Sequence, residues 1–190
     1  MIIVLSPAKT LDYETKNGDN NYSSPVFLSK SKILINELKK KKRSEVSSMM
    51  KLSDKLTNIN LERYQLWKAQ KIPSENAKQS IYVFKGDVYQ GLDVESFSKT
   101  DTKFAQKHLR ILSGLYGILK PLDIIEPYRL EMGTKLKTQN SDNLYDFWGN
   151  NIAKEIEKEL KKLKSKTPIN LASNEYYDSI QSLAEDIDVI

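Results

Sequence analysis

Two glycines three residues apart, Gly114 and Gly117, constrain the fold of this chain more than any other feature of its sequence. Glycine lets the backbone turn sharply and come close to another surface. The apolar periodicity of residues 101–113 predicts a helix before them, and a second short apolar segment follows. The order predicts a helix-hairpin-helix element, whose exposed amides and helix N-terminus are suited to holding a phosphate. The expected contacts come from Gly114, Leu115, Tyr116, Gly117 and Lys120.

Two prolines limit the second helix of this element. Pro121 comes four residues after Gly117, and proline suits the first turn of a helix but not its interior. The second helix must therefore begin near Lys120 and stay short. The same pattern also allows Gly114 to end a helix as its C-cap, with Tyr116 and Gly117 forming a simple turn.

Composition indicates a globular protein and removes several kinds of site. At 190 residues, one domain over residues 1–190 with a substantial core is expected. No apolar run approaches the ~20 residues that span a bilayer, and residues 1–10 do not form a signal peptide. With 0 cysteines and one histidine, disulfides, a redox-active thiol and an ordinary zinc site are excluded. His108 is expected to be a hydrogen-bonded core residue, and no cofactor is expected.

The coarse pattern predicts an α/β fold, with mixed α+β as the alternative, built on a central sheet with surrounding helices. Short apolar runs bounded by polar residues read as strands, and longer amphipathic segments read as helices. The expected strands are residues 2–5, 81–84, 169–172 and 186–190. The expected helices are residues 25–43, 44–60 with Ser44 as N-cap, 61–70, 101–113, 150–166 and 174–184.

Polar side chains follow three of the expected strands. Residues 2–5 lead to Ser6 and Lys9, residues 81–84 lead to Lys85 and Asp87, and residues 169–171 lead to a Ser-Asn-Glu segment. Ligands collect outside the carboxyl ends of parallel strands. If these strands are parallel neighbours, the lysines would line one crevice suited to phosphate, although polar turns commonly follow strands in any case.

Charge is distributed unevenly along the chain. The net charge is +5, but residues 167–190 contain five acidic and no basic side chains, so residues 1–166 carry +10. A basic body attracts polyanions. The lysine-rich runs at residues 39–43 and 150–166 are nevertheless read as solvated surface. Only four basic residues are arginines, and for two of them, Arg110 and Arg129, a bidentate contact and a structural ion pair are equally expected.

Seven segments carry a resemblance to a known family. They are LSPAKTLDY, SDKL, IYVFKGDVYQGL, LSGLYGILKPLD, PYRLEMG, DFWG and NLASNEYY, and they run in order from Met1 to Tyr177. Together they resemble the peroxide-stress protein YaaA family. Members of that family continue past this point with further strands, so the chain is expected to be C-terminally truncated, to expose a sheet edge at residues 186–190 and to aggregate more readily than a full-length relative.

The resemblance implies a cytoplasmic protein of the response to hydrogen peroxide. Such a protein limits damage to DNA by restraining free iron, and it binds double-stranded DNA non-specifically through a basic cleft and a helix-hairpin-helix. It is expected to be a monomer without a membrane partner. Lys9, Lys85 and Arg129 would supply the cleft charge.

Two other functions remain open. The first is an enzyme acting on a nucleotide or another phosphorylated small molecule, in which Lys9, Lys85 and Arg129 hold the anion. Asp87 or Glu131 would then act as base or metal ligand, although the spacing of Asp87, Glu126 and Glu131 does not require a metal. The second is a stress-linked interaction protein whose motifs are purely structural.

Overall fold

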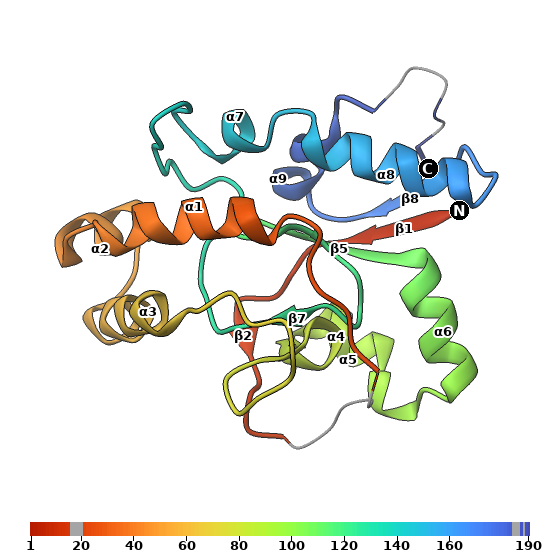
Figure 1. Ribbon diagram of the computed structural model, residues 1–190, viewed down its shortest axis with the longest axis horizontal. Coiled ribbons are helices and arrows are strands. Elements are labelled where there is room, and N and C mark those ends of the chain that lie inside the picture. The colour runs from red at the N-terminus through yellow and green to blue at the C-terminus, as the bar shows by residue number, and fades with distance from the viewer. Residues whose placement is uncertain (16–20, 184–186, 188) are drawn as a thin grey trace.

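A four-stranded mixed sheet with the order β6-β5-β1-β8 lies at the centre of the protein (Figure 1). The computed structural model describes residues 1–15, 21–183, 187 and 189–190. Strand β1 is parallel to both of its neighbours, and β6 is antiparallel to β5. The strands are β1 Ile2–Leu5, β5 Leu109–Ser113, β6 Gly117–Leu119 and β8 Pro168–Leu171. The near-continuous apolar runs of β1 and β5 are typical of strands buried on both faces.

Two helices cover the sheet, and three more form a separate group. Helix α8 packs against β1, and α6 packs against both β1 and β5; in Figure 1 they lie above and below the strands. Three further helices, α1 to α3, form the opposite end of the molecule. The larger helices are α1 Leu28–Lys39, α2 Arg43–Met50, α3 Asp54–Leu66, α6 Lys99–His108 and α8 Asn151–Lys162.

Short elements connect these layers. Two small antiparallel ladders pair β2 with β4 and β3 with β7. The short strands are β2 Thr10–Leu11, β3 Lys78–Gln79, β4 Phe84–Lys85 and β7 Ile124–Ile125. The short helices are α4 Ser80–Val83, α5 Asp87–Leu92, η1 Val94–Ser96, α7 Leu144–Trp148, α9 Asn174–Tyr177 and η2 Asp178–Ile180.

The mixed α/β fold confirms the predicted class, and several predicted elements are in place. The strands at residues 2–5 and 169–172 correspond to β1 and β8. The amphipathic helix at 150–166 is α8, whose apolar stripe of Ile152, Ile156 and Leu160 is buried. Within the described residues, no helix is long and apolar enough to cross a bilayer.

The predicted helix-hairpin-helix is wrong, because a β-hairpin occupies its place. Helix α6 ends at His108, and the chain continues as β5, which pairs with β6 so that Ser113 lies opposite Gly117. The short, mainly apolar segment Leu109–Ser113 fits a helix face and a buried strand equally well by periodicity. The segment forms a strand because it pairs with β1. Gly117 lies at the turn of the hairpin, with a φ of 71°.

The strand predicted at 81–84 is also wrong. Residues 80–83 form the short helix α4, so this segment is not a neighbour of β1 in the central sheet. Two helices were predicted with wrong bounds around Ser44. Helix α2 begins at Arg43 after the N-cap Lys42 and ends at Met50, and its C-cap Lys51 has a φ of 51°. Ser53 caps α3, which runs through both predicted segments.

The C-terminal expectations are met in part. The helix predicted at 174–184 is split into α9 and the 3-10 turn η2, and Ala184 lies outside the described residues. Most of the strand predicted at 186–190 also lies outside them. At Ile190, the N–H donates to the Pro168 carbonyl (3.0 Å) and the carbonyl accepts from the Asn170 N–H (2.6 Å), the alternation of a parallel strand pair beside β8.

Candidate functional site

The β5–β6 hairpin is enclosed by the core. Leu115 is 0% exposed and Tyr116 is 1% exposed. The Tyr116 hydroxyl accepts hydrogen bonds from Trp67 Nε1 and from the Glu126 N–H, both at 3.0 Å. A Cβ at Gly114 would lie 2.3 Å from the Leu130 carbonyl oxygen. The glycines therefore serve close packing inside the protein, and their backbone does not face a surface ligand.

Three of the predicted site residues come together at the carboxyl ends of β1 and β8. Lys9 Nζ lies 3.4 Å from one oxygen of Glu131, and Arg129 Nη2 donates to the other at 2.9 Å. The adjacent strand ends are joined through Ser6 and Ser173, because the Ser173 N–H donates to Ser6 Oγ at 2.9 Å. Lys9, Arg129 and Glu131 therefore meet beside the ends of two of the three strands that were expected to form a crevice.

We call the space beside Lys9, Arg129 and Glu131 the strand-end crevice. It contains a small cavity. Its volume is about 70 Å³, and the charged side chains that line it are Lys9, Arg129, Glu131 and Glu175. Glu175 Oε1 accepts from the Gly133 N–H at 2.8 Å. Tyr176 also lines the cavity, and burial, together with the neighbouring tyrosine and carboxylates, raises its pKa. The crevice balances two cations against two carboxylates.

Lys85 and Asp87 lie away from the strand-end crevice. Lys85 Nζ is 3.6 Å from both Asp12 and Glu95, and Asp87 begins helix α5. They are separated because their segment lies outside the central sheet. In the part of the chain that the structure describes, no three His, Cys, Asp or Glu side chains come together as metal ligands do.

A second concave surface, which we call the lysine groove, lies along helix α6. Its volume is about 710 Å³. The lining residues are Asn21, Lys99, Thr102, Lys103, Gln106, Lys107, Lys120 and Leu122. Lys99, Lys103 and Lys107 are spaced four residues apart, so they lie along one face of the helix. Among the described residues, no carboxylate lines this groove.

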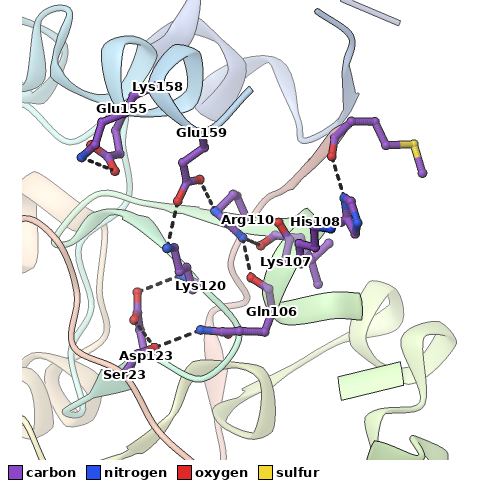
Figure 2. A network of polar contacts seen from close by, with 12 residues as sticks. Ser23, Gln106, Lys107, His108, Arg110, Lys120, Asp123, Glu155, Lys158 and Glu159 are labelled. Carbon is purple, nitrogen blue, oxygen red and sulfur yellow. Dashed lines mark hydrogen bonds and ion pairs between the residues drawn. The ribbon is translucent and has the colours of Figure 1, made fainter. Parts of the chain in front are cut away.

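A polar network fixes the walls of the lysine groove relative to each other (Figure 2). Gln106 Nε2 donates to Ser23 Oγ (3.1 Å), and Gln106 Oε1 accepts from the Leu122 N–H (2.9 Å). Asp123 accepts from the Ser23 hydroxyl and from the Lys120 N–H at 2.6 and 2.8 Å. The loop after β6 is thereby held beside α6.

Arg110 and Glu159 form a buried ion pair behind the groove. Their side chains are 4% and 6% exposed, and Arg110 Nε donates to Glu159 Oε2 at 2.5 Å (Figure 2). Lys120 Nζ reaches the other oxygen of Glu159 at 3.0 Å. Burial alone raises the pKa of Glu159, but the hydrogen bonds and charges of Arg110 and Lys120 outweigh it and hold that pKa below its ordinary value. Of the two roles expected for Arg110, a bidentate contact and a structural ion pair, the structure shows the ion pair.

The only histidine is also structural in character. His108 is half-buried, its Nδ1 lies 2.8 Å from the Met1 carbonyl, and its ring packs against Phe104 at an interplanar angle of 38° with a 4.5 Å centroid separation. The predicted hydrogen bond is present, but the residue lies at the edge of the core.

Sequence reasoning missed three residues of the lysine groove: Lys99, Lys103 and Lys107 were not singled out. The signal was present as lysines at a spacing of four in an amphipathic helix. That spacing does not stand out in the sequence, because lysine is common throughout the chain and the run at 39–43 is a denser basic cluster.

Comparison with known proteins shows the family of this chain. A family model described as peroxide stress protein YaaA matches residues 1–190. A UPF0246 protein of Colwellia psychrerythraea is 50% identical over 181 residues, which cover 95% of this chain and 70% of that protein. A UPF0246 protein of Shewanella sediminis is 46% identical with the same coverage. This chain belongs to the peroxide stress protein YaaA family.

Proposed function

We propose that this member of a peroxide stress family binds double-stranded DNA without base specificity, through the lysine groove. The observation that carries the proposal is the lining of the groove: four lysines and, among the described residues, no carboxylate. Coating DNA in this way would shield it during oxidative stress. Lys120, which was predicted from sequence, keeps its role as a phosphate contact, and the three lysines of α6 take the place of the buried hairpin.

The geometry of α6 suits contacts to a phosphate backbone. Lysines four residues apart rise about 6 Å per step, so the stripe from Lys99 to Lys107 extends over about 12 Å of helix. Duplex DNA presents one negative charge per ~1.7 Å of its axis, so each lysine can meet a separate phosphate. Lysine is a point charge with rotatable donors, which favours backbone contact over base recognition.

The lysines of α6 are available for such contacts. Lys99, Lys103 and Lys107 are exposed, and no ion pair to a described residue engages them. Lys120 is 42% exposed and shares Glu159 with Arg110. Because Arg110 already balances Glu159, Lys120 retains charge for a phosphate.

The test compares two variants that each lose three exposed lysines. The first carries Lys99→Gln, Lys103→Gln and Lys107→Gln in the groove, and the matched control carries Lys154→Gln, Lys161→Gln and Lys162→Gln on α8. Fluorescence anisotropy measures the affinity of each for two duplexes of unrelated sequence. The groove variant is expected to bind both duplexes at least about tenfold more weakly than the control. Equal affinities of the two variants would show that DNA binds outside the lysine groove.

A further inference from the structure

Arg129, one of the residues that line the strand-end crevice, carries an unsatisfied donor. Among the described residues, Arg129 Nε is the one buried side-chain nitrogen or oxygen that has no hydrogen-bond partner in the protein. The Arg129 side chain is 18% exposed, and its Nη2 is already used by Glu131. Leaving a buried donor unpaired costs about 1–3 kcal/mol, so native proteins rarely do so without a ligand or a water to receive it.

A second cation lies across the same cavity. Lys9 Nζ contacts Glu131 at 3.4 Å, and its side chain is 67% exposed. The contact is long for a charge-assisted hydrogen bond, and an exposed pair of this kind contributes little to stability. Lys9 can therefore leave Glu131 at little cost when a stronger anion arrives.

Glu131 occupies the position of an internal counterion. Its two oxygens are divided between Arg129 and Lys9, and its side chain is 27% exposed. A phosphate carries more negative charge than a carboxylate and accepts from several donors at once. If Lys9 leaves its ion pair with Glu131, a phosphate can accept hydrogen bonds from both Arg129 Nε and Lys9 Nζ.

We propose that the strand-end crevice binds one small tetrahedral oxyanion, either free phosphate or the phosphate of a phosphomonoester, between Lys9 and Arg129. The cavity of about 70 Å³ accommodates a group of that size. The carboxylates of Glu131 and Glu175 on its wall oppose the dense charge of a duplex. The ligand is therefore a small molecule, and this site is separate from the lysine groove.

Isothermal titration calorimetry with inorganic phosphate and with ribose 5-phosphate tests the proposal. We expect saturable binding of one anion per chain, in the unaltered protein and in the variant that lacks the three lysines of α6. Lys9→Ala and Arg129→Lys should each weaken it about tenfold, because the first removes a charge and the second removes the Nε donor while keeping the charge. Lys85→Ala, which removes a lysine outside the crevice, should leave the affinity unchanged.

Glu131→Gln gives the sharpest outcome. If Glu131 competes with the ligand, its neutralisation should tighten phosphate binding several-fold, a result that a purely structural role would not produce. Tighter binding of ribose 5-phosphate than of phosphate would identify a phosphomonoester as the ligand. Two results would overturn the proposal: no saturable binding up to about 10 mM phosphate, or affinity that is unaltered in both Lys9→Ala and Glu131→Gln. Because Lys9 is exposed, its variant should fold even if Arg129→Lys does not.

Discussion

Trp148 holds Gly117 in a position that no other residue can take. Gly117 has a φ of 71°, and a Cβ added there would lie 2.8 Å from Cζ3 of the Trp148 ring. The indole N–H donates to the Gly114 carbonyl at 3.0 Å, so the same side chain secures both glycines of the hairpin. Trp148 itself is 0% exposed. This contact makes Gly117 a requirement of the core, as the Leu130 carbonyl does for Gly114.

Gly117→Val should therefore destabilise the fold. The left-handed backbone costs a side-chain-bearing residue about 1 kcal/mol or more, and the clash with Trp148 adds about 1–3 kcal/mol of overpacking. Urea unfolding should show a loss of about 2 kcal/mol or more in the free energy of unfolding. DNA affinity per folded molecule should stay normal. A selective loss of DNA binding would show that the hairpin contributes to the DNA-binding surface.

Gly91→Ala is the control for that substitution. Gly91 lies in helix α5 with no atom within 4 Å of an added Cβ. Alanine is favoured over glycine in a helix by about 0.5–1 kcal/mol, so this variant should unfold at the same urea concentration or a higher one. A loss as large as that of Gly117→Val would show that the effect is not specific to the hairpin.

Glu159→Gln should unfold the protein more easily because it leaves the buried charge of Arg110 unbalanced. Breaking a buried ion pair on one side typically costs about 3–5 kcal/mol. The matched change on the surface is Asp142→Asn, which removes the exposed pair with Lys137 and should cost under about 1 kcal/mol. Thermal or urea unfolding distinguishes the two. Similar losses would mean that Arg110 finds another partner.

Stability should also fall in acid, and Asp12 is one of the groups responsible. Hydrogen bonds from the Thr15 hydroxyl and N–H lower the pKa of Asp12 to about 2, from the ordinary value of 3.8. A depressed folded-state pKa stabilises the protein above the unfolded pKa, and that stability is lost as pH falls from about 4 toward 2. Glu159 acts with the same sign.

Asp12→Asn tests this contribution. Urea midpoints measured at pH 7, 4 and 3 should decrease less steeply for the variant than for the unaltered protein, because the variant has no carboxylate to protonate at this position. Parallel decreases would assign the acid sensitivity to Glu159 and other carboxylates instead.

The sequence was most informative where one physical signal dominated. The apolar run at residues 2–5 and the amphipathic stripe of α8 each allow one interpretation, and both were confirmed. Of the lysines predicted to line a crevice at the strand ends, Lys9 lies beside Glu131, which also binds Arg129, and Lys85 lies elsewhere. These predictions required only local periodicity and the position of strand ends.

Other features depend on tertiary contacts that the sequence does not reveal. Residues 109–113 become a strand because β1 lies beside them, and residues 80–83 become a helical turn between two short ladders. The separation of Lys85 from Lys9 follows from that second difference. The lysines of α6 line a groove only because the loop around Lys120 is held against the helix by Gln106 and Asp123.

The salt dependence of DNA binding tests the central claim most directly. Each phosphate contact releases counterions, so a plot of log affinity against log salt concentration loses about 0.9 of slope for each contact removed. Replacing Lys99, Lys103 and Lys107 with glutamine should therefore make the slope shallower by about 2 to 3, while the α8 control variant keeps the slope of the unaltered protein. An unchanged slope in the groove variant, or a reduced slope only in the α8 variant, would contradict the assignment of the lysine groove as the DNA-binding surface.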